Sequence, residues 1–216
     1  YIAQTAGFDN VITGDMGGTS FDVALIANGK SMLSPQTSID FGLVVRAPMI
    51  EITTIGAGGG SIAWVDRGGL LNIGPESAGS DPGPVCYGLG GTRPAVTEAA
   101  LLLGKLDPTG FAGGRMTLDV AGATAALRSQ VAEPLAGGSS MDEVEAAFGV
   151  SEVVNENMAA AARAHLGEWG RGTVGRTLIA FGGAAPLHAC TLASKLKIDR
   201  VVVPVNAGGG SAVGIL

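Results

Sequence analysis

The sequence predicts an α/β fold, in which helices flank a mixed β-sheet. Three observations lead to it: residues 1–95 read as short strands joined by tight turns, residues 96–176 as helices, and residues 177–216 as strand, loop and helix. Strands that first precede helices and then alternate with them are typical of a mixed sheet with helices packed on it. We expect these three parts to form one domain over residues 1–216.

The strand-rich part reads as a series of hairpins. Residues 10–27 are two apolar strands around a glycine turn, and Asn28-Gly29 is a turn that pairs strands tightly. Residues 31–55 are rich in β-branched and apolar side chains, which favour strands, and residues 62–73 form another hairpin. The prolines of residues 74–95 predict an irregular loop of fixed shape.

The middle part is predicted to be helical. We expect helices over residues 96–104 and 119–131, the second ending before the proline that follows it. Residues 140–143 have the Ser-x-x-Glu form of a capping box, which predicts a helix start there and a break near Gly149. Apolar residues at helical spacing over 150–169 predict a further helix with one buried side.

The last part predicts strand, turn, helix and strand. Residues 177–181 and 200–205 are the strands, residues 187–195 are the helix, and residues 182–186 are a tight glycine turn between the first strand and the helix.

Composition narrows the class of protein. The 216 residues carry a net charge of −6 and only 5% aromatic residues, which argues against nucleic acid or an anionic membrane as the main partner. No apolar run is long enough to span a membrane, and no signal peptide is visible. Cys86 and Cys190 are too few for a disulfide framework and indicate reduced thiols, so we expect a cytoplasmic protein.

The turn between the first two strands has the residues of a phosphate site. Gly17 and Gly18 would bare the backbone N–H groups to an anion, and Thr19 and Ser20 would add hydroxyl donors. Asp15 repels a phosphate, so its role would be to position Mg²⁺ through water. The alternative is an ordinary hairpin turn that begins with a capping aspartate.

A second glycine loop, Gly182-Gly183-Ala184-Ala185-Pro186, leaves one strand and opens a helix. Its small residues would let a flat ring lie against the backbone. The alternative is a tight strand–helix turn. His188 follows on the first turn of the helix, where it would either contact a ligand or pack against the fold.

Other residues leave two interpretations open. The loop of Gly58, Gly59, Gly60 and Ser61 would line a substrate or phosphate, or would be a packing crossover under the hairpin. Asp22 would be a second acidic group near the metal or a surface residue of the hairpin. Three smaller predictions concern single side chains: Cys86 is a structural thiol, while His165 and the pair Asn155 and Glu156 face solvent.

Two such loops in this order resemble the superfamily of sugar kinases, Hsp70 and actin. There, an Asp-x-Gly-Gly-Thr hairpin grips phosphates and a Gly-Gly-x-x-x-Pro loop receives adenosine. The chain is most similar to the hydantoinase A/5-oxoprolinase family within that superfamily. The resembling segments are residues 15–24, 55–63, 74–79, 82–88, 96–99 and 181–189. The chain departs from the family pattern at Ala185, where glycine is more usual, and at Glu98, where aspartate is.

The resemblance implies a fold, an activity and partners. The fold would be a ribonuclease H-like mixed sheet flanked by helices, as in an actin-like ATPase lobe. The activity would be ATP-dependent hydrolysis of a cyclic amide, with ATP and Mg²⁺ as cofactors and a hydantoinase B-type subunit or domain as partner. Two alternatives remain open: a subunit of an acetone- or acetophenone-type carboxylase, and a non-catalytic module that docks a partner subunit.

The resemblance also implies roles for site residues. Phosphates would be held by Gly17, Gly18, Thr19 and Ser20, and Asp15 would be the catalytic residue that positions Mg²⁺ and water. The second loop and the helix after it would also bind the nucleotide. The residues concerned are Gly182, Gly183, Ala184, Pro186 and His188.

The ends of the chain suggest a piece of a longer polypeptide. It starts without methionine in what reads as a helix end, residues 1–7, and stops in what reads as a helix opening, residues 211–216. In the family, an amino-terminal lobe carries a first phosphate hairpin. We therefore predict that this segment alone binds ATP weakly or not at all and does not turn over. Tight binding of Mg-ATP in a calorimetric titration would contradict this.

Overall fold

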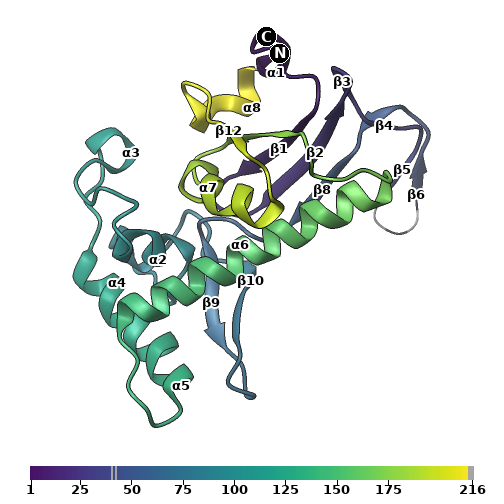
Figure 1. Ribbon diagram of the computed structural model, residues 1–216. Coiled ribbons are helices and arrows are strands. Elements are labelled where there is room, and N and C mark those ends of the chain that lie inside the picture. Colours follow the sequence, from purple (N-terminus) through teal and green to yellow (C-terminus); the bar gives the residue numbers. More distant parts are fainter. Residues whose placement is uncertain (40, 42, 214–216) are drawn as a thin grey trace. The chain divides into compact units, whose positions relative to one another are not determined.

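The computed structural model describes residues 1–39, 41 and 43–213 of the chain (Figure 1). The described residues divide into two compact units. The first unit consists of Tyr1–Asp15, Asp22–Thr54 and Ala159–Leu216, and the second consists of Met16–Phe21 and Ile55–Met158. The chain thus leaves the first unit twice, once briefly at the glycine turn and once for about a hundred residues.

A mixed sheet is the centre of the fold. Within the described residues its six strands are β1 (Val11–Met16), β2 (Phe21–Ala27), β3 (Lys30–Ser31), β8 (Ile52–Ile55), β11 (Thr177–Phe181) and β12 (Arg200–Val202). Their order is β12-β11-β1-β2-β3, and β8 also pairs with β2. β11 is parallel to both β1 and β12, whereas β2 and β3 are antiparallel. The predicted mixed sheet is therefore confirmed.

Side-chain alternation explains why these residues form strands. In β2, Phe21, Val23 and Leu25 are buried, and the residues between them are only partly buried. This period of two matches a strand with one face on a core. The first four residues of β11 are all buried, as expected for a parallel strand in the middle of a sheet.

Helices pack on the sheet of the first unit. α7 (Ala185–Leu196) follows β11, packs against β11 and β12 and leads into β12, so it is the crossover of a parallel pair. α1 (Ile2–Thr5) and α8 (Gly210–Val213), preceded by the 3₁₀ turn η4 (Ala207–Gly209), lie near the two ends of the described chain. Helices beside a mixed sheet complete the α/β class that the sequence predicted.

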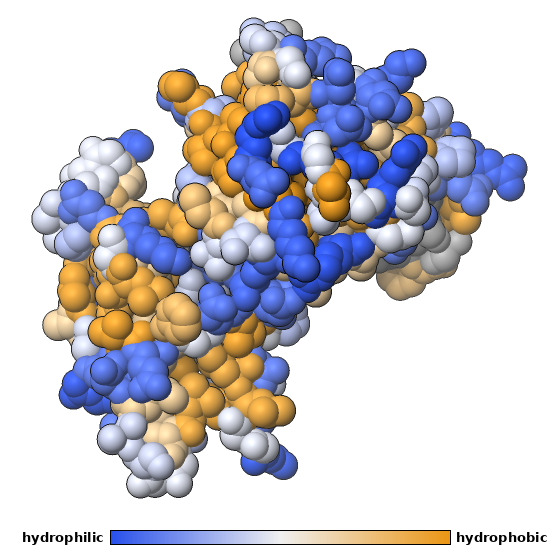
Figure 2. All heavy atoms as spheres, in the orientation of Figure 1, coloured by the Kyte–Doolittle hydropathy of each residue, from blue (hydrophilic) through white to orange (hydrophobic). Residues whose placement is uncertain are grey.

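Short ladders and one long helix complete the first unit. β4 (Leu33–Ser34) pairs with β7 (Met49–Ile50), and β5 (Thr37–Ile39) pairs with β6 (Leu43–Val45), which confirms strands over residues 31–55. The last ten residues of the long helix α6 (Glu143–Glu168) belong to the first unit, and the rest belong to the second. Figure 2 shows hydrophilic side chains along the outer side of this helix.

The second unit joins a hairpin to a helical cluster. β9 (Ser61–Val65) pairs antiparallel with β10 (Leu71–Ser77). The helical elements are η2 (Val85–Tyr87), α2 (Val96–Leu102), α3 (Phe111–Gly114), α4 (Val120–Leu127), the π turn η3 (Arg128–Ala132) and α5 (Glu133–Ala136). Cys86 is buried in their core with Leu101, Leu118 and Ala123. Burial raises the pKa of its thiol far above the ordinary range, as expected for a structural cysteine.

Several predicted boundaries are wrong. β12 ends at Val202, whereas the strand was predicted to run to residue 205. β10 runs to Ser77, inside the stretch expected to be an irregular loop. The second predicted helix continues through Pro134 to Ala136, because the proline falls in the first turn of α5, where its missing N–H costs little. α6 is capped by Asp142, whose Oδ1 accepts the Glu145 N–H at 2.7 Å, and passes Gly149 without a break.

Two side chains predicted to face solvent are buried. His165 is 1% exposed, and its Nδ1 lies 2.9 Å from Thr53 Oγ1. Asn155 is fully buried, and its Nδ2 donates to the carbonyl oxygen of Ser151 one turn earlier. Glu156 is exposed, as predicted. The apolar stripe did not reveal this burial, because α6 is packed on more of its circumference than the stripe covers.

No helix among the described residues has the length and apolar character that crossing a membrane requires.

The burial of His165 predicts a pH dependence of stability. Burial lowers the pKa of its imidazole from the ordinary value of 6.5, although the nearby carboxylates of Glu168 and Glu51 oppose the shift. The unfolded chain therefore binds a proton more readily than the folded one, so stability falls as the pH drops through about 6.5. In the full-length protein, His165→Phe should have a lower melting temperature than wild type at pH 8, because the contact with Thr53 is lost. Between pH 8 and pH 5.5 its melting temperature should fall less than that of wild type. Parallel melting curves for the two proteins over this range would contradict the prediction.

Candidate functional site

The two glycine loops begin side by side. β1 and β11 are parallel neighbours, and their register pairs Gly14 with Ala180 and Asp15 with Phe181. Each strand ends there and passes into its glycine loop. Ligands of open α/β sheets bind outside the carboxyl ends of the strands, so this edge is the first place to look for a site.

The turn after β1 is open. Gly17 donates its N–H to the carbonyl oxygen of Ser20 at 3.2 Å and so closes the turn. Gly18 and Thr19 at its tip are exposed. A Cβ added to either glycine would meet no heavy atom within 4 Å, and neither glycine has a positive φ. The turn therefore does not need glycine for its φ angles. These two glycines instead leave the backbone accessible, because no side chain covers it.

Two carboxylates of the hairpin line one cavity. Asp15 in β1 accepts a hydrogen bond from the Ser211 hydroxyl, and Asp22 in β2 accepts one from the Thr54 hydroxyl. Both belong to the lining of an open cavity of about 600 Å³ in the first unit, to which Thr13 also contributes. Asp22 is thus directed into a cavity together with Asp15, and this favours the first of its two interpretations.

This set of donors fits Mg²⁺. Magnesium ions keep several waters and use one or two protein carboxylates together with phosphate oxygens. The described residues contain no group of three or more His, Cys, Asp or Glu that would form an all-protein cage. Two carboxylates with neighbouring hydroxyls in one cavity match a magnesium site that is shared between protein, water and phosphate.

The loop after β11 is shaped by one glycine. Gly182 has a φ of 89°, a conformation that side chains rarely adopt, and its N–H donates to the carbonyl oxygen of Ala207 at 2.8 Å. Gly183 is exposed with open space around it. Pro186 sits in the first turn of α7, where its fixed φ suits a helix start. His188 is 2% exposed and packs within the unit, which favours the second of its two alternatives.

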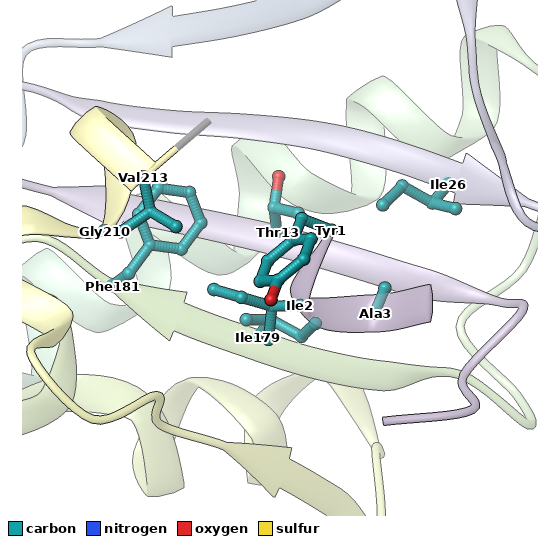
Figure 3. A pocket seen from close by; sticks show the side chains of 9 residues that line it. All are labelled: Tyr1, Ile2, Ala3, Thr13, Ile26, Ile179, Phe181, Gly210 and Val213. Carbon is teal, nitrogen blue, oxygen red and sulfur yellow. The ribbon is translucent and has the colours of Figure 1, made fainter. Parts of the chain in front are cut away.

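A separate hollow of about 150 Å³ lies on the sheet of the first unit (Figure 3). Its lining is mostly apolar and includes Ile2, Ile179, Phe181 and Val213. No charged side chain of the described residues contributes to it, so this lining does not suit a triphosphate or a cation.

The loop between β8 and β9 contacts the glycine turn directly. The N–H of Gly59 donates to the carbonyl oxygen of Gly17 at 3.0 Å, and that of Gly60 donates to the carbonyl oxygen of Gly18 at 2.6 Å. The N–H of Gly58 donates to Ser61 Oγ at 2.8 Å. These three N–H groups are therefore engaged within the protein.

Sequence reasoning missed two residues that hold this region. Thr97 donates both its N–H and its hydroxyl to the carbonyl oxygen of Gly59, at 2.8 and 2.7 Å. Glu98 is fully buried and accepts the N–H groups of Cys86 at 2.9 Å and Ala95 at 2.6 Å. A glutamate at the third position of a helix is a known capping signal, so Glu98 could have been found from sequence. Thr97 could not, because its partner is 38 residues away.

The family model for hydantoinase/oxoprolinase matches residues 1–216. The chain belongs to this family. Caprolactamase subunit alpha of Pseudomonas jessenii is 44% identical over 213 residues, and acetophenone carboxylase gamma subunit of Aromatoleum aromaticum is 42% identical over 218 residues. Both alignments cover 99% of this chain. 5-Oxoprolinase of Saccharomyces cerevisiae is 36% identical over 210 residues.

Solved structures of the family have the same fold. The crystal structure of the ATP-dependent caprolactamase from Pseudomonas jessenii matches 99% of this chain with a TM-score of 0.87 and 42% identity. Nucleotide-free acetone carboxylase matches equally well, with a TM-score of 0.87 and 31% identity. The chain spans only about 30% of the length of either protein. Several family relatives are named as subunits of larger enzymes.

The buried Glu98 carboxylate predicts a local stability effect. Glu98→Ala leaves two buried N–H groups without their acceptor. Each lost hydrogen bond to a charged group lowers the free energy of unfolding by about 1.5–3 kcal/mol. In the full-length Glu98→Ala protein, amide hydrogen exchange at Cys86 and Ala95 should become at least tenfold faster than in wild type. The exchange rates in Glu98→Gln should lie between those of wild type and Glu98→Ala. Glu145→Ala, an exposed change on α6, is the matched control. Unchanged exchange at both amides in Glu98→Ala would contradict the role.

Proposed function

We propose that this chain is the ATP-binding portion of an enzyme that hydrolyses small cyclic amides with the help of ATP. The observation that supports it most is the pairing of β1 with β11, which starts both glycine loops from adjacent positions at one sheet edge. Membership of the hydantoinase/oxoprolinase family and the similarity to caprolactamase subunit alpha point to the same reaction class.

In this proposal the first loop holds phosphates. The N–H groups of the exposed residues Gly18 and Thr19 donate to phosphate oxygens, and the hydroxyls of Thr19 and Ser20 add further donors. Asp15, with Asp22 beside it in the same cavity, holds Mg²⁺ through water. The metal, when bound, offsets negative charge on the phosphate oxygens.

The second loop holds adenosine. The bare backbone at Gly183 and the small side chain of Ala184 leave room for a flat ring, while Gly182 fixes the turn. Pro186 keeps the start of α7 in place behind the ring. His188 lies inside the unit, so in this proposal it supports the loop from within.

The chemistry activates an amide that is otherwise a poor electrophile. The amide oxygen attacks the γ-phosphorus of ATP and ADP leaves. A first water then adds to the activated carbon, and the ring C–N bond breaks as the nitrogen takes up a proton, which leaves an acyl phosphate. A second water hydrolyses this acyl phosphate to a carboxylate and inorganic phosphate. The chain's part in this sequence is to hold the phosphates and the metal in line for the transfer.

A second candidate is a subunit of an ATP-dependent ketone carboxylase. Acetophenone carboxylase gamma subunit is almost as similar to this chain as the caprolactamase subunit is. Activating a ketone as its enol phosphate calls for the same phosphate and metal ligands. Substrate-stimulated ATP hydrolysis that depends on bicarbonate favours the carboxylase, and hydrolysis that is independent of bicarbonate favours the amide hydrolase.

We also propose that the full enzyme includes a hydantoinase B-type subunit or domain. Relatives named as alpha, beta and gamma subunits support a multisubunit enzyme. A reading frame for such a partner should lie next to the gene for this chain.

Asp15 is the residue whose loss should affect turnover most. In the full-length enzyme with its partner, Asp15→Ala should lower substrate-stimulated ATP hydrolysis by about a hundredfold or more, because a charge that positions the metal is lost. Asp199→Ala, an exposed change, controls for altered surface charge. Unchanged ATP hydrolysis in folded Asp15→Ala would refute the role.

A further inference from the structure

We infer that residues 56–61, here called the glycine brace, position the phosphate turn without themselves binding phosphate. The brace turns the N–H groups of Gly18 and Thr19 toward the ligand. This inference rests on the proposed function, because it takes the turn after β1 to be the phosphate site. All residues that carry it belong to the second unit.

The first step concerns two peptide planes. The carbonyl oxygens of Gly17 and Gly18 accept hydrogen bonds from the N–H groups of Gly59 and Gly60. Both planes are trans, since the cis peptide bonds of the described chain are at Pro75 and Pro82. In a trans peptide the carbonyl and the next N–H point in opposite directions. The N–H groups of Gly18 and Thr19 therefore point away from the brace, on the exposed side of the turn.

Successive N–H groups on one side make an anion site. Two donors in a row form a concave backbone surface of the kind that binds phosphate. Without the brace, either carbonyl could rotate to that side and repel the anion. The hydrogen bonds to Gly59 and Gly60 hold both carbonyls away from it before the ligand arrives, and such preorganisation strengthens binding.

The second step concerns distance. A Cβ on Gly58 would lie 2.4 Å from the Thr19 nitrogen and 2.5 Å from the Gly18 carbonyl carbon. A Cβ on Gly60 would lie 2.9 Å from the Gly18 oxygen. The obstructing atoms are backbone of the turn itself, so any side chain at Gly58 must displace the turn. The glycines of the brace are needed for this close approach.

The third step concerns the anchor of the brace. Thr97, at the start of α2, donates two hydrogen bonds to the Gly59 carbonyl oxygen, and Ala78 donates its N–H to the Gly60 carbonyl oxygen at 2.8 Å. The next residue, Glu98, fixes the start of α2. A chain of contacts thus runs from α2 through Gly59 to the turn. Thr97 is a positioning residue that acts through the brace.

The alternative is that the brace binds phosphate directly. The N–H groups of Gly58, Gly59 and Gly60 are already donated within the protein, and residues 56–61 include no charged side chain. A phosphate would have to break the bonds that hold the turn. The contacts therefore favour positioning.

The test compares binding of Mg-ATP with binding of adenosine in the full-length protein. Gly58→Ala and Thr97→Val should each weaken Mg-ATP binding at least tenfold and leave adenosine affinity within twofold, because only the phosphate turn is displaced. Thr97→Ser keeps the hydroxyl donor and should bind Mg-ATP as wild type does. Gly167→Ala is the matched control, since it is an exposed glycine in α6 with no heavy atom within 4 Å of the added Cβ.

The outcomes separate the inference from the proposed function. Wild-type protein that binds neither ligand overturns the proposed function, and the inference with it. Wild-type protein that binds both, with Thr97→Val unchanged in Mg-ATP affinity, overturns the inference alone. Equal loss of adenosine and Mg-ATP affinity in Thr97→Val also overturns it, because general destabilisation would then explain the effect. Thr97→Val decides the matter if Gly58→Ala does not fold.

Discussion

The parallel pairing of β1 with β11 is the interaction on which the candidate site depends. It joins segments about 165 residues apart in the chain and fixes the register in which Asp15 lies opposite Phe181. Because the strands are parallel, their carboxyl ends meet at one edge, and the loop after each strand starts there. The long intervening segment includes β2 to β8 of the first unit, almost all of the second unit, and α6. Two loops that are far apart in sequence thereby start from neighbouring strands.

Backbone geometry, more than side-chain chemistry, shapes the proposed phosphate turn. Gly17 and Gly18 contribute bare peptide groups, and two hydrogen bonds from Gly59 and Gly60 set the direction of those groups. The carboxylates of Asp15 and Asp22 lie at the roots of the turn, on neighbouring strands. In the proposed site, oriented N–H groups and a metal ion would supply the positive potential that the side chains of this acidic chain lack.

The local patterns of the sequence predicted the strands, the main turns and the α/β class. Features such as the alternating burial in β2 and the glycine turns depend on residues only a few positions apart, so the sequence itself reveals them. Three kinds of feature could not be predicted. The burial of His165 and Asn155 depends on which other elements cover α6. The start of α6 depended on competition between Ser140 and Asp142 as caps, which spacing alone does not decide. The role of Gly58 depends on a backbone contact with Thr19, some forty residues away, so its spacing fitted a ligand loop as well as a brace.

The most direct test of the nucleotide site is amide hydrogen exchange of the full-length wild-type protein with and without Mg²⁺ and a non-hydrolysable ATP analogue. The geometry predicts that the amides of Gly18 and Thr19 become protected together with those of Gly183 and Ala184, while the amides of Gly59 and Gly60, already hydrogen-bonded, change little. Protection of both loops would support a nucleotide held between them. Saturating analogue that leaves both loops unprotected would contradict it.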